Sequence, residues 1–279
     1  MQQTDNLILN DGYAMPRIGL GVWQAKDGNE TRQAVKTAIE TGYRLIDTAM
    51  VYQNEESVGQ GIKDSGIDRN ELFVTTKLWN SDHGAGKVRP ALEASLRRLG
   101  LDYVDLYLIH WPTPERDLIV ETWKEFEALK ADGLVKSIGV SNFRIEDLER
   151  LKAETGTVPA VNQIELHPNF QQHELREYAR ANGIRIESWS PIGGSKGNLL
   201  QDPTLANVGE THSKSPAQIV IRWHLQNDLI VIPKSVHAER IQENFNVFDF
   251  ELSTSEMEQI NGLQTGTRSG PNPATMNNH

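Results

Sequence analysis

Cysteine is absent from the 279-residue chain, which excludes a disulfide framework, a thiol nucleophile and a thiolate metal site. Long apolar runs are absent too, since none approaches the roughly 20 residues that a membrane-spanning helix requires. The amino terminus, residues 1–6, shows no basic and apolar signal pattern. We therefore expect a soluble cytoplasmic protein that has no membrane partner and no metal site.

Positive charge is in the minority. The chain has 28 Lys and Arg against 38 Asp and Glu, a formal net charge of −10. Proteins that bind nucleic acids or anionic membrane surfaces generally present a basic face. We therefore expect no nucleic-acid partner, although a local basic pocket remains compatible with this charge.

The familiar phosphate-binding loops are missing as well. No Gly-x-Gly-x-x-Gly follows an early strand, and there is no Walker-type loop. A nucleotide site in this chain has to be built from other residues.

What the chain does contain is a regular alternation of strand and helix patterns. Residues 7–9 and 14–18 flank an Asp11-Gly12 turn, which predicts a β-hairpin. Several of the following apolar segments lack polar residues almost throughout, as is typical of parallel strands buried on both faces. The predicted strands are 17–20, 43–47, 72–77, 104–110, 135–141, 161–165, 184–189 and 229–234.

Helical patterns separate these strands. Val88, Leu92, Leu96 and Leu99 form one apolar stripe, and capping boxes at 215–218 and 253–256 predict two helix starts. Eight strand-helix units predict a (β/α)8 TIM barrel as a single domain over residues 1–279. The hairpin would cap it, one C-terminal helix would be additional, and the tail from 266 would be mobile or a flap. A doubly wound open sheet is the competing architecture.

Four polar residues lie at or just after the ends of successive predicted strands: Asp47, Tyr52, Lys77 and His110. In a barrel, the loops at the carboxyl ends of the strands build the active site. Singly, these residues are also compatible with an ion pair, a rim aromatic and a core histidine. Together they favour a functional site.

Their chemistry suits proton transfer to a carbonyl oxygen. A free phenol has a pKa of about 10, and the Lys77 ammonium would lower the pKa of Tyr52. Asp47 would be the counter-ion of Lys77, and His110 would orient the substrate oxygen. The set therefore predicts Tyr52 as a general acid.

Longer motifs resemble the aldo-keto reductase superfamily in the correct order along nearly the whole chain. They are GYRLIDTA at 42–49, LYLIHWP at 106–112, IGVSNF at 138–143, VNQIELHP at 161–168 and IPKS at 232–235. Segments 54–56, 75–80, 222–226 and 246–250 are most similar to bacterial reductases of the 2,5-diketo-D-gluconic acid reductase type. The resemblance implies NADPH-dependent reduction of an aldehyde or ketone to an alcohol, with the four polar residues as the catalytic set.

The chain itself offers features for that cofactor. Trp189 presents a flat face on which a nicotinamide can stack, and the small-residue loop 190–197 allows close approach of a pyrophosphate. Lys234, Ser235 and Arg240 follow the eighth strand, the usual phosphate corner of a barrel. Each feature is equally compatible with a structural role.

The resemblance implies a larger cofactor-binding set. Ser141, Asn142 and Gln163 would hold the nicotinamide carboxamide, the residues after the eighth strand would hold the 2′-phosphate, and Glu243 and Asn244 would lie near the adenine. His237 replaces an arginine of similar enzymes, which would permit weaker use of NADH beside preferred NADPH. The full predicted set is Gly21, Trp23, Ser141, Asn142, Gln163, Trp189, Ser190, Pro191, Ile192, Gly193, Lys234, Ser235, Val236, His237, Arg240, Glu243 and Asn244.

Trp23, Trp79 and Trp111 fall in loops after predicted strands and would wall a carbonyl pocket with Tyr52 and His110. No carboxylate clamp is identifiable, so small aldehydes, α-dicarbonyls, keto esters and keto-sugar acids are all compatible substrates. We expect a monomer.

Two other functions remain compatible with the sequence. A glycoside hydrolase on the same fold would use Glu165 and Glu187 as its carboxyl pair. A non-catalytic relative would bind NADPH as a regulatory subunit.

Overall fold

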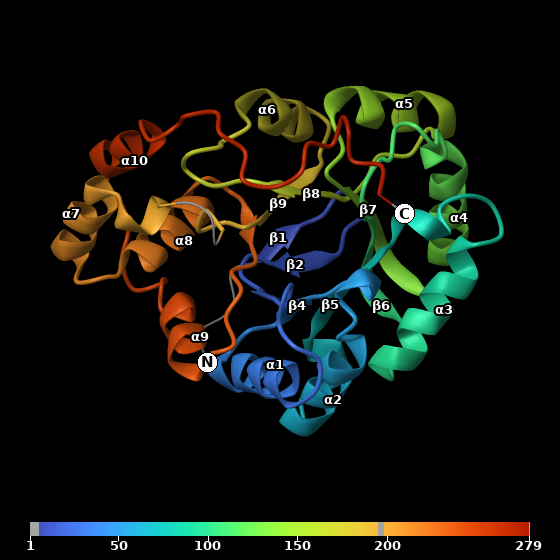
Figure 1. The fold of residues 1–279 in the computed structure, drawn as a ribbon, viewed down its shortest axis with the longest axis horizontal. Helices are drawn as coiled ribbons and strands as arrows, with labels where there is room; N and C mark the ends of the chain where they lie inside the picture. The colour runs from blue at the N-terminus through green and yellow to red at the C-terminus, as the bar shows by residue number, and fades with distance from the viewer. Residues whose placement is uncertain (1–5, 195–197, 279) are drawn as a thin grey trace.

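The computed structural model describes residues 6–194 and 198–278. An eight-stranded parallel sheet, in the order β10-β9-β8-β7-β6-β5-β4-β3, forms the centre of the molecule (Figure 1). This confirms the predicted (β/α)8 barrel. The strands are β3 (Leu20–Gly21), β4 (Leu45–Asp47), β5 (Phe73–Leu78), β6 (Val104–Ile109), β7 (Val135–Ser141), β8 (Val161–Glu165), β9 (Arg185–Trp189) and β10 (Ile230–Val231).

The sheet is closed by two isolated parallel bridges. Ile18 pairs with Val231, and Gly21 pairs with Lys234, so the first strand meets the last. A side chain at Gly21 would not fit, because its Cβ would lie 2.9 Å from the Ile232 carbonyl oxygen. The first strand pairs with β4 only from Leu20 onward, so its position is shifted toward the carboxyl side of the predicted 17–20.

Helices surround the sheet (Figure 1). The apolar stripe predicted at 88–99 is confirmed, because its side chains are buried on α3. Ser215 and Ser253 form the predicted capping boxes of α8 and α10, whereas α7 was not predicted. The helices are α1 (Asn29–Thr41), α2 (Glu55–Ser65), α3 (Val88–Leu99), α4 (Ile119–Ala131), α5 (Ile145–Thr155), α6 (His173–Ala181), α7 (Pro203–His212), α8 (Pro216–Gln226), α9 (Ala238–Phe245) and α10 (Thr254–Asn261), with short 3-10 turns η1 (Met50–Tyr52), η2 (Arg69–Glu71), η3 (Asn80–Asp82) and η4 (Leu199–Gln201).

The barrel interior changes character along its axis. Its amino-terminal half is filled by an apolar cluster that includes Leu9 and Met15 of the hairpin together with Leu45, Phe73 and Ile230 of the strands. Further along the same sheet come polar interior side chains, all buried: Asp47, Lys77, Gln163 and Glu187. Each large side chain buried in this apolar half contributes about 1.5–3 kcal/mol to the stability of the fold. The polar half lies at the carboxyl ends of the strands.

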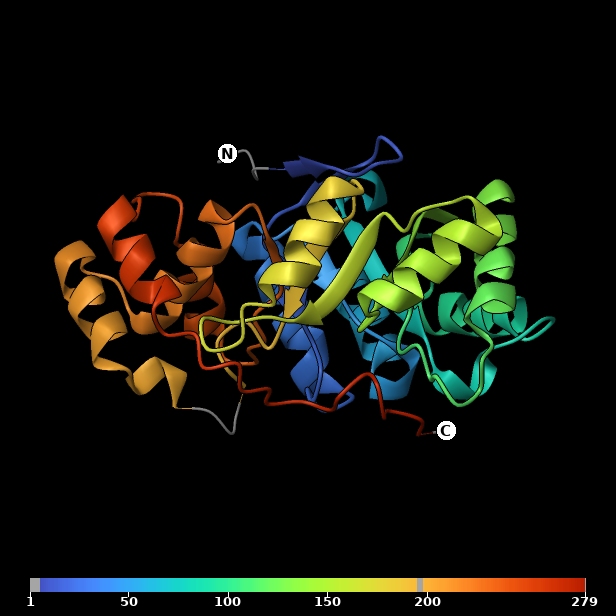
Figure 2. The same ribbon diagram turned by 90° about the horizontal axis from the view of Figure 1, so that it is seen from above.

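The hairpin that begins at Asn6 and the tail that ends at Asn278 cover opposite ends of the barrel. The hairpin of β1 (Asn6–Ile8) and β2 (Ala14–Pro16) lies on one side of the sheet, and the tail runs across the other (Figure 2). The tail is tied down by hydrogen bonds from Ser269 and Gly270 to Glu165, and by a bond from Asn80 to the Asn278 carbonyl.

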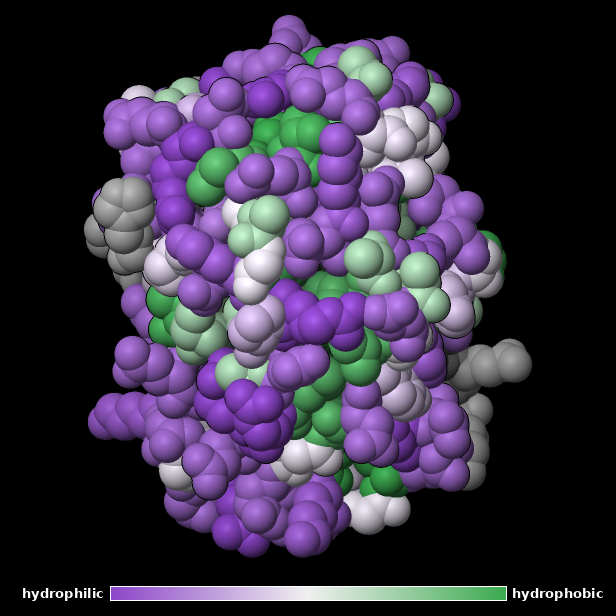
Figure 3. Space-filling view, turned by 90° about the vertical axis from the view of Figure 1, so that its right-hand side faces the viewer, coloured by the Kyte–Doolittle hydropathy of each residue, from purple (hydrophilic) through white to green (hydrophobic). Residues whose placement is uncertain are grey.

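The outer surface is mainly polar on the side that Figure 3 shows, where hydrophilic residues cover most of the face and apolar ones appear in narrow strips. Among the described residues, no helix combines the length and the apolar character needed to cross a bilayer.

Candidate active site

Asp47, Tyr52, Lys77 and His110 converge at the carboxyl end of the barrel, as predicted. The Lys77 ammonium is fully buried and donates hydrogen bonds to Asp47 Oδ1 at 2.7 Å, the Thr48 carbonyl at 2.9 Å and the Tyr52 hydroxyl at 3.3 Å. All three donors of the ammonium thus have an acceptor. The His110 and Tyr52 rings meet edge to face, with centroids 5.8 Å apart.

Local structure after β4 places the Tyr52 side chain. Tyr52 ends the 3-10 turn η1, and the following residue adopts a left-handed conformation. The buried Asn54 then holds the turn in place by donating to the Val22 and Ala25 carbonyls and accepting from Thr48. The phenol is therefore held between two strand-end loops rather than on a free loop tip.

The charge state of Lys77 follows from its partners. Burial by itself lowers the pKa of Lys77, but the negative charge of Asp47 and the nearby Tyr52 phenol outweigh burial, so the pKa is raised. Lys77 is therefore a cation at neutral pH.

The pKa of Tyr52 differs from the prediction. Burial, the largest effect, raises the pKa of Tyr52 above its ordinary value, and the Lys77 charge offsets only part of that rise. The predicted lowering is therefore wrong in net direction, because the cost of burying a phenolate was not counted. The phenol keeps its proton at neutral pH, which is the form that a proton donor needs.

His110 is neutral as well. Burial, then the charge of Lys77, holds the pKa of His110 well below its ordinary range. Its Nδ1 is buried without a hydrogen-bond partner among the described residues. A neutral imidazole at this position can orient an oxygen through a hydrogen bond but is a poor proton donor.

The tryptophans differ in how they meet the site. Trp79 and Trp111 flank the His110 ring, with centroids 5.3 and 6.3 Å from it, and Trp111 is 6% exposed. Trp23 is 52% exposed. Two of the three tryptophans predicted to wall the pocket thus lie against His110, whereas Trp23 is largely exposed to solvent.

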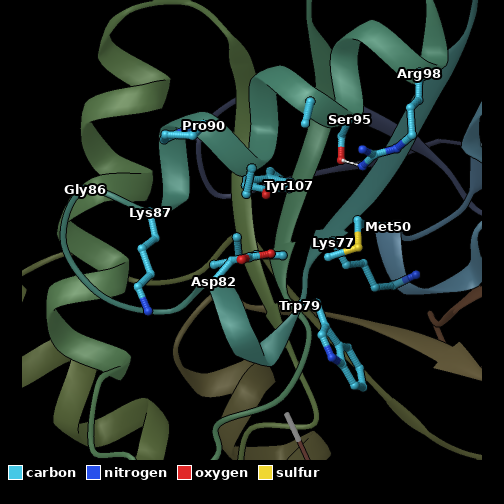
Figure 4. A pocket seen from close by; sticks show the side chains of 13 residues that line it. Met50, Lys77, Trp79, Asp82, Gly86, Lys87, Pro90, Ser95, Arg98 and Tyr107 are labelled. Carbon is cyan, nitrogen blue, oxygen red and sulfur yellow. Dashed lines mark hydrogen bonds between the residues drawn. The ribbon is translucent and has the colours of Figure 1, made fainter.

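A cavity of about 440 Å³ lies beside the catalytic group, and its lining includes Lys77 and Trp79 (Figure 4). It is bounded by α3 and by Leu78 and Tyr107, whose side chains belong to the core cluster outside the sheet. The Tyr107 hydroxyl makes no hydrogen bond to a described residue, and Tyr107 is 1% exposed.

The residues predicted to hold a carboxamide form one network. Asn142, with φ 63°, donates to Ser141 Oγ and to the His110 carbonyl, each at 3.0 Å, and accepts from Trp189 Nε1 at 2.8 Å. Ser141 Oγ donates to the Gln163 carbonyl. The amide nitrogen and oxygen of Asn142 therefore already have hydrogen-bond partners within the protein, whereas Gln163 Oε1 accepts no hydrogen bond from the described residues.

A cluster of cations after β10 is exposed. Within the ranges 6–194 and 198–278, Lys234 and Arg240 take part in no ion pair, and both flank the start of α9. His237 is exposed at the cap position of this helix, and its backbone N–H donates to Ser235 Oγ. Asn244 is buried on the same helix. These groups form a local positive site at a helix amino terminus, which suits an anion.

Part of the predicted small-residue loop lies outside the described residues, namely 195–197. Ser190 and Gly193 are described, and both have positive φ. The side chains of Pro191, Ile192 and Val236 are apolar and can neither donate nor accept a hydrogen bond.

Two buried glutamates acquire partners that the sequence did not reveal. Glu187 accepts from Gln163 Nε2 at 2.7 Å, and the same nitrogen donates to Asp47 Oδ2 at 2.8 Å. Glu165 accepts from His167 and from Ser269 and Gly270 of the tail. Each carboxyl group therefore has its own set of partners, which does not favour the paired use that a glycoside hydrolase requires.

The Aldo/keto reductase family model matches residues 17–265. The chain belongs to this family. It is therefore an oxidoreductase, and the resemblance inferred from its motifs is confirmed at the level of the superfamily.

Relatives of similar length support this assignment. The chain is 53% identical to an aldo-keto reductase of Mycolicibacterium smegmatis over 271 residues, covering 97% of this chain and 98% of that protein. It is 52% identical to the methylglyoxal reductase DkgA of Yersinia pestis over 265 residues, covering 95% of both chains.

Its structure is also similar to that of a Gox0644 mutant in complex with NADPH. The TM-score is 0.93 at 49% identity, covering 98% of this chain and 99% of the other.

Proposed function

We propose that this protein reduces aldehydes and ketones to alcohols with NADPH, with Tyr52 as the general acid. The observation that carries the proposal is the position of the Tyr52 hydroxyl, 3.3 Å from the buried Lys77 ammonium, which is itself paired with Asp47 at the carboxyl end of the barrel. Similarity to a methylglyoxal reductase and to a protein bound to NADPH supports it.

The cofactor would supply a hydride to the carbonyl carbon. As negative charge develops on the carbonyl oxygen, Tyr52 donates its phenolic proton to that oxygen. The Lys77 ammonium then stabilises the phenolate that remains, and Asp47 keeps Lys77 charged within the buried site. Neutral His110 donates a hydrogen bond that orients the carbonyl oxygen.

The chain's residues fit an NADPH molecule at both ends. Trp189 is only partly buried and can offer a face to the nicotinamide, while Gln163 Oε1 is available to accept from the carboxamide. Lys234 and Arg240, which pair with no acidic group of the described residues, lie beside a helix amino terminus, which suits the 2′-phosphate. This positive cluster would favour NADPH over NADH, with His237 weakening the preference.

Replacing Arg240 tests the phosphate assignment. We expect Arg240→Met to raise the KM for NADPH by roughly tenfold or more, the cost of losing a charge-assisted hydrogen bond, and to leave the KM for NADH within about twofold. Arg97→Met, which removes an exposed arginine on α3, is the matched control and should change neither value. Equal effects of Arg240→Met on both cofactors would contradict the assignment.

The proposed substrates are small aldehydes, with α-dicarbonyls such as methylglyoxal foremost, and keto-sugar acids such as 2,5-diketo-D-gluconate as weaker candidates. The wild-type protein should oxidise NADPH when it is mixed with members of a panel of these compounds, and the absorbance of NADPH measures the rate. We expect kcat/KM to be highest for the α-dicarbonyls. A chain that binds NADPH yet turns over no member of the panel would instead support the regulatory alternative, for which no structural observation speaks.

A further inference from the structure

One buried ionisable group of the barrel interior has no part in the mechanism above. Glu187 on β9 is 0% exposed, and its Oε2 accepts from Gln163 Nε2 at 2.7 Å. Its other oxygen, Oε1, is buried and meets no hydrogen-bond partner among the described residues. A buried carboxyl group in such surroundings has to be explained, because burying its charge is costly.

Gln163 connects this carboxyl group to the catalytic residues. Its Nε2 uses one N–H for Glu187 and the other for Asp47 Oδ2, at 2.8 Å. Asp47 in turn accepts from Lys77, and Lys77 donates to Tyr52. A continuous chain of hydrogen bonds therefore runs from β9 through β8 and β4 to the phenol.

The same two bonds fix the orientation of the Gln163 amide. Rotating the amide by half a turn would place Oε1 against the Asp47 carboxylate, which can only accept, and would lose that hydrogen bond. With Nε2 held inward, Oε1 is the atom left for a ligand.

We infer that Glu187 is a positioning residue for the reduction: as an uncharged carboxyl group it holds Gln163 Oε1 toward the nicotinamide site, and its ionisation at alkaline pH weakens catalysis. This inference rests on the proposed function and extends it to a residue outside the catalytic four.

The charges that face Glu187 explain why it stays uncharged. Asp47 approaches from β4, Lys77 from β5 and Tyr52 from η1, whereas the paired residue on β10 is the apolar Ile230. Lys77 is already balanced by Asp47, so an ionised Glu187 would leave a net negative charge in the interior. Burial, followed by the Asp47 charge, raises the pKa of Glu187 to about 8.

Ionisation would act on the proton donor. A charged Glu187 raises the pKa of Tyr52 further, which makes the phenol a weaker acid. The negative charge of Glu187 would also offset part of the Lys77 charge, which otherwise stabilises the phenolate. The rate of reduction should therefore fall as pH rises through about 8.

The pH dependence of kcat in Glu187→Gln tests this switch, because the amide cannot ionise. We expect the alkaline decline of the wild type to move upward by at least one pH unit in Glu187→Gln. Glu187→Leu removes the acceptor for Gln163 and should lose at least tenfold in kcat/KM for NADPH at pH 6.5, a loss that Glu187→Gln largely restores. Identical pH profiles in wild type and Glu187→Gln would overturn the inference.

A second measurement needs no cofactor and no turnover. Because the pKa of Glu187 is raised on folding, the folded wild type keeps a proton that the unfolded chain releases. Its stability therefore falls as pH rises from the ordinary carboxyl value of 4.5 to about 8. The melting temperature of Glu187→Gln minus that of the wild type should increase across this window. A difference that is independent of pH would overturn the inference.

Glu165 is the matched control, because it is also buried but its pKa is shifted in the opposite direction. Burial raises its pKa, but hydrogen bonds from His167, Ser269 and Gly270 outweigh burial and lower it. Glu165→Gln should therefore lose stability relative to the wild type as pH rises through the ordinary carboxyl range. If the wild type reduced no carbonyl compound, the proposed function would fail, whereas the melting experiment would still decide the state of Glu187.

Discussion

Tyr52→Phe is expected to lower kcat for aldehyde reduction by at least about a hundredfold, the usual contribution of a general acid. The substitution removes the phenolic proton and leaves the ring in place against His110 and Lys77. NADPH affinity should change little, because no predicted contact to the cofactor is lost. Steady-state kinetics with a small aldehyde, together with titration of NADPH by quenching of tryptophan fluorescence, gives both values.

Tyr107→Phe is the matched control for this experiment. Tyr107 is likewise buried and lies on β6, the strand beside that of Lys77, but it lines the cavity against α3, on the outer side of the sheet (Figure 4). Its hydroxyl has no hydrogen-bond partner among the described residues, so kcat should stay within about twofold of wild type. Near-wild-type activity in Tyr52→Phe would defeat the assignment of the general acid.

The sequence was a good guide to the barrel because its strand signals are local. β6, for example, is a short and largely apolar segment, as is typical of a parallel strand that is buried on both faces. Local patterns did not predict the exact position of the first strand or the presence of α7. Leu20–Gly21 depends on closure against β10, and α7 is an additional helix between the last two strands, with an Asp202-Pro203 start as its only clear signal.

The site was predictable to the extent that it follows from topology. Residues at the ends of neighbouring parallel strands must lie near one another, which is why Asp47, Lys77 and His110 were found together. The direction of the Tyr52 pKa was not predictable, because it depends on how deeply the phenol is buried. The partners of Glu187 depend on which atom of a distant side chain faces it, and no spacing in a sequence reveals that.

The Asp47–Lys77 pair permits a prediction about stability and activity together. Lys77→Met leaves Asp47 as a buried, unpaired carboxylate, and breaking a buried ion pair in this way costs about 3–5 kcal/mol. We expect urea unfolding of Lys77→Met to show a loss of that size. We also expect kcat to fall by at least about a hundredfold, since the phenolate loses its stabilising charge.

The double variant Asp47→Asn/Lys77→Met separates the two effects. With both charges removed, no unpaired carboxylate remains, and replacing a buried ion pair by neutral groups is often nearly neutral for stability. The amide that this variant carries at position 47 can still accept from Gln163, so we expect at least half of the lost unfolding free energy to return. Activity should stay as low as in Lys77→Met, because the ammonium beside Tyr52 is still missing. Recovery of kcat together with stability would show that Lys77 supports the fold alone and has no part in proton transfer.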